Sequence, residues 1–173
     1  MSYQSVEEAY ARCNEDGIEF WKAIQLEDMD ENGITEEDSW KRMKGMWQAM
    51  LTGIDAYEPD EVSGSGLVGK EGGLMETYQK KGDTLCGDYM AKVMTNALKM
   101  GCNNACMKRI VAAPTAGACG VLPAALATYY RVYGIPEVKM IDALYVAAGI
   151  GQIIANRAYL AGALGGCQAE IGS

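Results

Sequence analysis

Apolar residues recur at helical spacing in several separate segments of the chain. In the segment 40–54 they fall three, four and seven residues apart, which predicts a helix with one buried face. The members of this stripe are Trp40, Met43, Trp47, Met50, Leu51 and Ile54. The segment 86–98 restores the same spacing, and Gly101 is a suitable helix end. Because no segment alternates apolar and polar residues as a half-buried strand does, the pattern predicts an all-α helical bundle.

Helix starts are indicated at two N-terminal positions. Ser5 is followed by Glu8, and Thr35 by Asp38; at this spacing the first side chain accepts a hydrogen bond from an N–H of the first turn. We therefore expect two N-terminal helices. The segment 57–73 contains one proline and five glycines, which break the helical period and predict a long loop. Loops of that length are often functional.

The C-terminal part of the chain is rich in alanine and glycine. Apolar residues at 118–132 predict a helix, followed by a last helix that begins near Pro136. The apolar stretch 140–166 carries several polar groups, too many for the middle of a membrane span, so we expect a buried helix pair. These groups are Asp142, Gln152, Asn156 and Arg157. With small residues on every face, and with Gly149 and Gly151 as a kink, this segment suits the centre of the bundle.

Composition and charge narrow the function classes. The 173 residues fit one domain. The 23 acidic and 15 basic residues give a net charge of −8, which disfavours nucleic acid and anionic membrane surfaces as partners. No basic segment followed by an apolar one opens the chain, so we expect a cytoplasmic protein with reduced thiols.

The cysteines are interpreted mainly as ordinary thiols. Cys13 and Cys86 fall on apolar helical faces and are predicted core residues. Cys102 and Cys106 are spaced to lie one helical turn apart. Since the chain has no histidine, a zinc site would need four cysteines in register, and we favour simple thiols at this pair.

An EF-hand pattern occurs between residues 28 and 39. The residues at its ligand positions are Asp28, Asp30, Asn32, Gly33 and Glu36. Position twelve, which should be a bidentate glutamate, is Ser39. An acidic turn that caps a helix is therefore the favoured interpretation, and calcium binding is the alternative.

A glycine pattern in the predicted loop resembles a nucleotide-binding motif. Gly64, Gly66 and Gly69 spell G-x-G-x-x-G, and the run as far as Lys70 spells most of a P-loop. Both motifs need a preceding strand to aim the loop, and the preceding residues are a poor strand. Glu71 also replaces the hydroxyl residue that would hold magnesium, so a nucleotide site is disfavoured.

Three runs carry a resemblance to one enzyme family. They are R-I-V-A-A-P-T-A-G-A-C-G at 109–120, G-G-C-Q-A-E-I-G-S at 165–173 and S-G-L-V-G at 65–69. Together they resemble the catalytic α chain of the iron–sulfur-dependent L-serine dehydratases, with a looser similarity over 61–173. Lys70 and Glu71 stand where the loop of that family has Gly-Asp. The resemblance implies one α-helical domain over 1–173, the N-terminal part of the α (catalytic) domain.

The resemblance also implies a cofactor and partners. In the family a [4Fe–4S] cluster held by three thiolates acts as a Lewis acid while L-serine is converted to pyruvate and ammonia. Cys167 matches one ligand position, and the run that carries the other two is expected beyond Ser173, so the ligand set here is incomplete and the domain is expected to be truncated. Because the chain has no histidine, the general base is expected from a β domain or chain. A homo- or hetero-oligomer is expected.

Substrate contacts are implied by the same resemblance. Thr115, Ala116 and Gly117 precede a predicted helix and would bind the substrate carboxylate through backbone N–H groups and the threonine hydroxyl. Ser65 and Gly66 of the glycine-rich loop are further candidates for substrate binding.

Three further residues belong to this hypothesis. Asn156 and Gln168 would hydrogen-bond to substrate or cluster sulfides, or else satisfy buried backbone groups. Cys119 is interpreted as a packed thiol near the site. The alternative function, from a different class, is a non-catalytic helical relative of the family that acts through oligomerisation.

Overall fold

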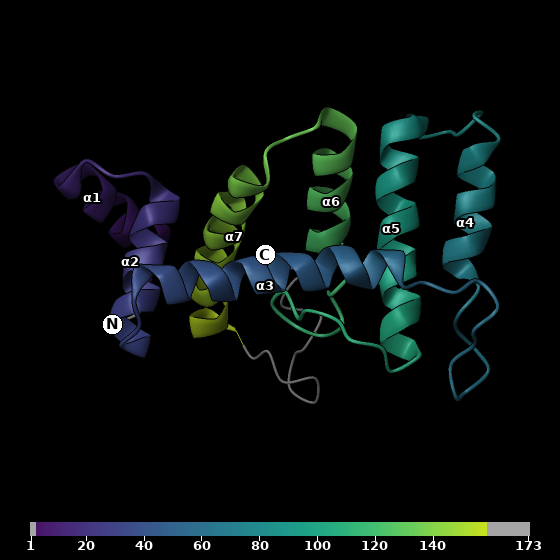
Figure 1. The fold of residues 1–173 in the computed structure, drawn as a ribbon, viewed down its shortest axis with the longest axis horizontal. Coiled ribbons are helices and arrows are strands. Elements are labelled where there is room, and N and C mark those ends of the chain that lie inside the picture. Colours follow the sequence, from purple (N-terminus) through teal and green to yellow (C-terminus); the bar gives the residue numbers. More distant parts are fainter. Residues whose placement is uncertain (1–2, 159–173) are drawn as a thin grey trace. The chain divides into compact units, whose positions relative to one another are not determined.

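The computed structural model describes residues 3–158, which form seven helices and no strand (Figure 1). The helices are α1 (Val6–Asp16), α2 (Phe20–Asn32), α3 (Glu36–Asp55), α4 (Glu71–Lys80), α5 (Gly87–Ala105), α6 (Val121–Tyr133) and α7 (Glu137–Arg157). The predicted all-α fold is confirmed. The chain divides into two compact units. The first holds α1, α2, α7 and the start of α3, and the second holds the rest of α3 with α4, α5 and α6. That the chain is a single domain stays a prediction.

The N-terminal helices begin at the predicted caps. The Ser5 hydroxyl accepts a hydrogen bond from the N–H of Glu8, and the Thr35 hydroxyl accepts one from the N–H of Asp38, both at 3.2 Å. The expected number of N-terminal helices is wrong, because α2 lies between the two. Helix α2 begins after Glu19, whose side chain does not cap it, so its start has no capping signal in the sequence.

Helix α7 packs against α2 in the first unit. Ile141 and Tyr145 of α7 are buried together with Ala9 of α1 and Ile24 of α2. Gly149 permits a close approach, because a Cβ atom there would lie 2.5 Å from Cδ1 of Ile24. Helix α7 is continuous through its glycines. The second helix of the pair predicted in this region falls on residues outside the described range.

Among the described helices, α7 is the one long and apolar enough to meet the criteria for a membrane span. Core helices of globular proteins meet the same criteria. The hydroxyl of Tyr145, halfway along α7, is buried and hydrogen-bonds to the Ser39 hydroxyl at 2.8 Å and to the Gln25 amide at 3.4 Å. These contacts fix α7 to α2 and α3, although only 33% of its most apolar 18 residues are buried, so α7 is less buried than predicted.

The segment with EF-hand spacing does not form a calcium loop. Asp28 and Asn32 lie inside α2, which ends at Gly33 with a φ of +61°. The Asp28 carboxylate accepts hydrogen bonds from the hydroxyl of Ser39 and from the side-chain amide of Asn32. Asp28 and Asn32 therefore stabilise the end of α2, and Asp28 joins it to α3. This agrees with the favoured interpretation of the segment as an acidic turn at a helix end.

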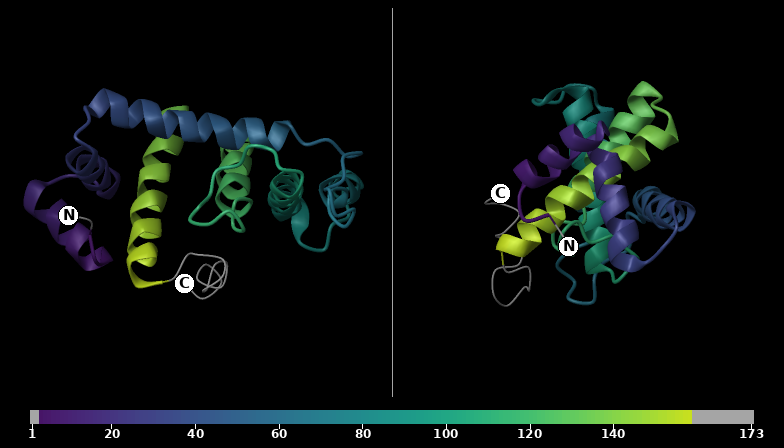
Figure 2. Two further views of the ribbon diagram at one scale, coloured as in Figure 1. Left: turned by 90° about the horizontal axis from the view of Figure 1, so that it is seen from below. Right: turned by 90° about the vertical axis from the view of Figure 1, so that its left-hand side faces the viewer.

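Helices α4, α5 and α6 lie side by side in the second unit (Figure 1, Figure 2). Helix α4 approaches α5 at Gly72, where a Cβ atom would lie 2.8 Å from Cγ of Lys99. Lys99 also forms an ion pair with Glu76 of α4 at 2.8 Å. Helix α5 meets α6 through a 3.0 Å hydrogen bond from the Asn96 amide to the Thr128 hydroxyl.

Several predicted boundaries differ from the structure. The predicted loop 57–73 gives way to α4 before its end, and the predicted helix 118–132 begins three residues late, as α6. Helix α5 continues past Gly101, the predicted stop, by one further turn. In that turn the Asn103 amide donates a 2.5 Å hydrogen bond to the carbonyl of Gly53 at the end of α3. This tertiary contact stabilises the extra turn.

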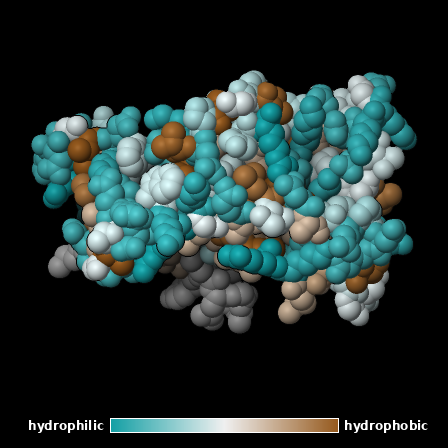
Figure 3. All heavy atoms as spheres, in the orientation of Figure 1, coloured by the Kyte–Doolittle hydropathy of each residue, from teal (hydrophilic) through white to brown (hydrophobic). Residues whose placement is uncertain are grey.

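Burial follows the predicted stripe on α3 and departs from the prediction on α5. Trp47, Met50 and Ile54 are no more than 3% exposed. Cys13 is buried as predicted, whereas Cys86 is exposed, so its assignment to the core is wrong. Cys86 is the residue before the first turn of α5. The face of the molecule in Figure 3 is largely hydrophilic, with scattered apolar side chains, as the charged composition predicts.

Candidate functional site

The glycine-rich loop between α3 and α4 is a compact turn. The N–H of Ser63 donates to the carbonyl of Val68 at 2.7 Å, and the N–H of Gly66 donates to the carbonyl of Ser63 at 2.8 Å. Gly66 has a φ of +74°, which favours glycine. The exposed Ser65 hydroxyl lies 3.0 Å from the Ser63 hydroxyl. Ser65 therefore presents a positioned hydroxyl, while the N–H of Gly66 is used inside the turn.

Glu71, the first residue of α4, holds this loop against α5. Its Oε2 atom accepts hydrogen bonds from the N–H of Gly69 at 2.8 Å and from the thiol of Cys102 at 3.3 Å. Gly69 has a φ of +153°, and a Cβ atom there would overlap the backbone of Glu61. A second clamp comes from Tyr57, whose hydroxyl donates to the carbonyl of Gly69 at 2.9 Å. The sequence reasoning did not find these roles of Glu71, Cys102 and Tyr57.

The clamp sets the electrostatics of the loop. The pKa of the Glu71 carboxyl is lowered, chiefly by the hydrogen bond from the N–H of Gly69. Burial raises the pKa of the Cys102 thiol, and the carboxylate of Glu71 beside it raises it further. Burial likewise raises the pKa of the Tyr57 hydroxyl. At neutral pH the arrangement is therefore a carboxylate that accepts from a thiol and a backbone N–H.

The second candidate loop, Thr115–Gly117, precedes α6 without forming its first turn. Helix α6 begins at Val121, so the partial charge of the helix N-terminus lies several residues beyond Thr115. The carbonyl of Thr115 accepts from the N–H of Ala113 at 3.2 Å, and the carbonyl of Ala116 accepts from the N–H of Cys119 at 3.3 Å. The loop is thus folded on itself; it precedes a helix, as predicted, but the first turn of α6 does not include Thr115, and its contact with the substrate stays a prediction.

The C-terminal end of α5 carries contacts to both loops. Cys102 bonds to Glu71 beside the glycine-rich loop, and the Asn104 amide donates to the carbonyl of Ala116 at 3.1 Å. Residues two apart on a helix point about 200° away from each other, so the loops attach to different sides of the same turn. Lys108 then binds Glu61, at the start of the glycine-rich loop, at 2.5 Å. The two candidate loops of the second unit are therefore both attached to the C-terminal end of α5.

Cys119 is buried beneath the second loop. Its exposed fraction is 1%, and its thiol lies 3.9 Å from the carbonyl of Met100, which confirms that it is a packed thiol. Gly120 follows it, where a Cβ atom would lie 2.7 Å from the carbonyl oxygen of Ala97. The loop and the start of α6 thus lie directly on the backbone of α5.

The remaining predicted residues are not part of this cluster. Asn156 belongs to α7 in the first unit, where its amide donates to the carbonyl of Tyr3 at 3.2 Å and its oxygen accepts from Gln152 at 3.1 Å. The bond to Tyr3 is exposed to solvent, so Asn156 contacts backbone without satisfying a buried group, and its role stays a prediction. Cys167 and Gln168 lie outside the described residues.

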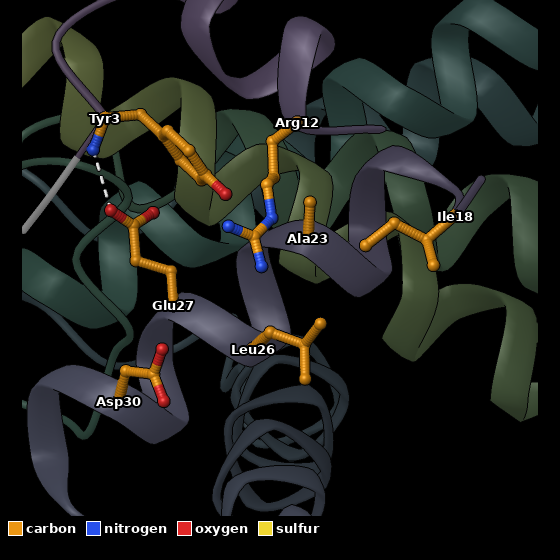
Figure 4. A pocket seen from close by; sticks show the side chains of 7 residues that line it. All are labelled: Tyr3, Arg12, Ile18, Ala23, Leu26, Glu27 and Asp30. Atoms are coloured by element: carbon orange, nitrogen blue, oxygen red, sulfur yellow. Dashed lines mark hydrogen bonds between the residues drawn. The ribbon is translucent and has the colours of Figure 1, made fainter. Parts of the chain in front are cut away.

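Away from these loops, the described part of the chain encloses at least two cavities. A small one of about 190 Å³ lies in the first unit, where the Arg12 guanidinium extends from α1 and Glu27 and Asp30 face it from α2 (Figure 4). A larger one of about 680 Å³ lies in the second unit and includes Arg131 and Asp55, which are paired at 2.8 Å. Neither is lined by a predicted substrate-binding residue.

The described residues do not hold a metal-ligand set. No group of three or more histidine, cysteine, aspartate or glutamate side chains is placed to hold a metal ion within this part of the chain. Cys102 and Cys119 are buried and bonded within the protein. The thiols between residues 3 and 158 therefore do not fit an iron–sulfur cluster by themselves.

Fold and site together define an all-α protein with two glycine-containing loops fixed to one helix end. Residues 15–173 match the family described as serine dehydratase alpha chain, and the chain belongs to this family.

Individual proteins that this chain resembles carry serine dehydratase names. The chain is 34% identical over 168 residues to the L-serine dehydratase alpha chain of Peptoniphilus asaccharolyticus, covering 93% of this chain and 56% of the relative. A probable L-serine dehydratase alpha chain of Bacillus subtilis is 29% identical over 171 residues, covering 99% and 57%. L-serine dehydratase 2 of Escherichia coli is 28% identical over 176 residues, covering 98% and 38%. The chain thus spans about half the length of the alpha chains it matches, and less of the longer relative. No solved structure matches it significantly.

Proposed function

We propose that this chain provides the substrate loops of an L-serine dehydratase, a carbon–nitrogen lyase that forms pyruvate and ammonia. The observation that carries the proposal is the family match over 15–173, which includes both loops anchored on the end of α5. Names of relatives that specify an alpha chain support a β chain as partner. The metabolic character of these relatives supports a cytoplasmic location.

The proposed reaction is an elimination followed by hydrolysis. L-serine loses the proton on Cα and the hydroxyl on Cβ as water, which leaves aminoacrylate. Aminoacrylate tautomerises to an imine, and water converts the imine to pyruvate and ammonia. The enzyme must therefore orient the carboxylate, remove the Cα proton and assist departure of the hydroxyl.

The chain's own contribution is to bind and orient the substrate. Thr115, Ala116 and Gly117 are proposed to contact the carboxylate from a loop that the Asn104 amide holds in place. The Ser65 hydroxyl, positioned by Ser63, is proposed to bind a polar group of the substrate. The general base is proposed to come from the β chain, because this chain has no histidine.

A [4Fe–4S] cluster is proposed as the cofactor, with Cys167 as one ligand. The described thiols do not form the rest of a ligand set, so the remaining ligands would have to come from outside residues 3–158. Iron and sulfide per chain, measured after anaerobic reconstitution, test this assignment. Cys167→Ser is expected to abolish cluster binding and the matched Cys106→Ser variant to retain it. Equal iron in both variants would reject Cys167 as a ligand.

The experiment for the function is pyruvate formation from L-serine by the reconstituted chain together with a β chain of the family. Pyruvate and ammonia are expected in equal amounts. Thr115→Val is expected to raise the KM for L-serine at least about tenfold, the loss of one good contact to a charged group. Thr77→Val, an exposed threonine of α4, serves as control. A complex that binds the cluster and forms no pyruvate would reject the proposed reaction.

A second candidate function is a helical protein that acts through association alone. The observation that favours it is the series of exposed apolar side chains Met90, Met94 and Leu98 on α5. It predicts a stable, colourless assembly without iron after the same reconstitution, which separates it from the catalytic proposal.

A further inference from the structure

The larger cavity of the second unit is lined mainly by polar and charged side chains. It has a volume of about 680 Å³, and its lining comes from the end of α3 and from α4, α5 and α6. Cavities that bind small molecules have volumes of about 300–1,000 Å³. Because no candidate substrate-binding residue lines it, a ligand here would occupy a site separate from that of the proposed reaction.

The charges of the lining favour an anion. Three basic side chains line the cavity, namely Lys92, Lys99 and Arg131, against two acidic ones, Asp55 and Glu76. One positive charge is therefore in excess, although the whole chain has a net charge of −8. A cleft whose local charge is positive attracts a negatively charged small molecule.

The ion pairs inside the cavity leave donors available to a ligand. Arg131 donates to both carboxylate oxygens of Asp55 through its Nη2 atom, at 2.8 Å in each case. Lys99 donates to Glu76 at 2.8 Å. A guanidinium has five N–H donors and an ammonium has three, so the donors on Nε and Nη1 of Arg131 remain for the oxygens of a ligand.

Polar groups of α5 and α6 supply further contacts. Thr128 of α6 lines the cavity and is 2% exposed. Its hydroxyl oxygen accepts a hydrogen bond from the Asn96 amide at 3.0 Å, whereas its hydroxyl hydrogen has no acceptor among the described residues. A buried donor without an acceptor costs free energy. Since Lys92, Asn96 and Lys99 lie four and three residues apart on one face of α5, a ligand bound to the lysines is also within reach of this amide and hydroxyl.

These groups together define the chemical class of the ligand. A dianion would meet the carboxylates of Asp55 and Glu76, and like charges disfavour such a contact. We propose that the cavity binds a polyhydroxylated monocarboxylate of the size of a sugar acid. Its carboxylate accepts hydrogen bonds from Arg131, and its hydroxyl groups bond to Thr128 and Asn96. The assignment does not depend on the proposed reaction, because it requires neither candidate loop and no cluster.

Isothermal titration calorimetry of this chain with D-gluconate tests the assignment. Three other compounds separate the features of the ligand. D-sorbitol has the hydroxyl groups without the carboxylate, acetate has the carboxylate without the hydroxyl groups, and inorganic phosphate is a different anion. D-gluconate is expected to bind saturably, and each of the other three is expected to bind at least about tenfold more weakly, because each lacks one or more good hydrogen bonds.

Matched variants locate the binding in the cavity. Arg131→Gln is expected to weaken the binding of D-gluconate at least about tenfold. Arg42→Gln makes the same change at an exposed residue of α3 that does not line the cavity, and is expected to leave binding unchanged. Because Arg131→Gln also removes the ion pair with Asp55, Lys92→Gln is a second variant with the same expected loss. Circular dichroism establishes that the variants remain helical.

A second readout and the remaining outcomes decide the question. In NMR spectra the side-chain amide signals of Asn96 are expected to shift on addition of D-gluconate, and those of Asn14, an exposed residue of α1, are expected to stay unchanged. Equal binding by Arg131→Gln, Lys92→Gln and the unchanged chain would place the ligand elsewhere. Acetate that binds as tightly as D-gluconate, or phosphate that binds more tightly, would overturn the proposed class. Binding of none of the compounds would overturn the site itself.

Discussion

Replacement of Gly120 by alanine tests how the second candidate loop is seated. Gly120 has a φ of −88° and a ψ of −26°, a conformation that any residue adopts, so backbone strain does not oppose the change. The new Cβ atom would lie 2.7 Å from the carbonyl oxygen of Ala97 and 3.4 Å from its Cα atom. These atoms belong to the backbone of α5 and cannot rotate away. Overpacking against a rigid neighbour costs about 1–3 kcal/mol.

Gly101→Ala is the matched control for this prediction. Gly101 lies in α5, the helix that Gly120 contacts, but nothing lies within 4 Å of a Cβ atom built at Gly101. Alanine inside a helix is more favourable than glycine by about 1 kcal/mol, so this variant is expected to be slightly more stable than the unchanged chain. The two substitutions are chemically identical, and their free energies of unfolding are expected to differ by about 2–4 kcal/mol.

Urea unfolding followed by circular dichroism measures this difference. With a slope of about 2 kcal/mol per molar urea, Gly120→Ala is expected to lower the midpoint by roughly 0.5–1.5 M. All three tryptophans lie in the first unit, so fluorescence reports on that unit separately. A midpoint for Gly120→Ala at or above that of the unchanged chain, or an equal loss in Gly101→Ala, would refute the steric argument.

Three further predictions concern the clamp and the first unit. The pKa of Glu71 is lowered, so the stability that its carboxylate contributes is present above the ordinary carboxyl pKa and is lost only as the pH falls through the lowered value. An NMR titration that follows the amide shift of Gly69 should therefore have a midpoint below 4.5. A higher midpoint contradicts the clamp. Tyr57→Phe removes two hydrogen bonds, at 2.9 and 2.8 Å, and should destabilise the chain by about 1–3 kcal/mol in urea unfolding; an unchanged midpoint contradicts this. Gly149→Ala forces its Cβ against Ile24 and should cost about 1–3 kcal/mol, seen as an earlier fluorescence transition; a later one rejects the close approach.

The elements found from sequence are those whose signals are local. Ser5 and Thr35 each bond to an N–H three residues ahead, so the two residue types and their spacing are sufficient to place a helix start. The buried stripe on α3 is similarly a property of one segment. Helix α2 has no side-chain cap, and α4 contains two glycines in its first turn, which resemble loop residues when read alone.

The boundaries that sequence misplaced depend on contacts between segments. Gly72 is tolerated inside α4 because Lys99 of α5 occupies the space that a Cβ would need. Gly101 does not end α5 because the next turn is held by the bond from Asn103 to Gly53. In both cases a contact between segments explains why a glycine lies inside a helix, and local helix propensity does not predict such a contact.

The candidate site was located only in part for the same reason. Ser65 and Thr115 are candidates because their runs resemble family motifs, and their neighbours along the chain are candidates for the same reason. Glu71 acts through Cys102, which lies 31 residues away, and no pattern in the sequence connects the two. The substitution of the family's Gly-Asp by Lys70 and Glu71 retains a carboxylate at the second position, and that carboxylate is the one that accepts the N–H of Gly69.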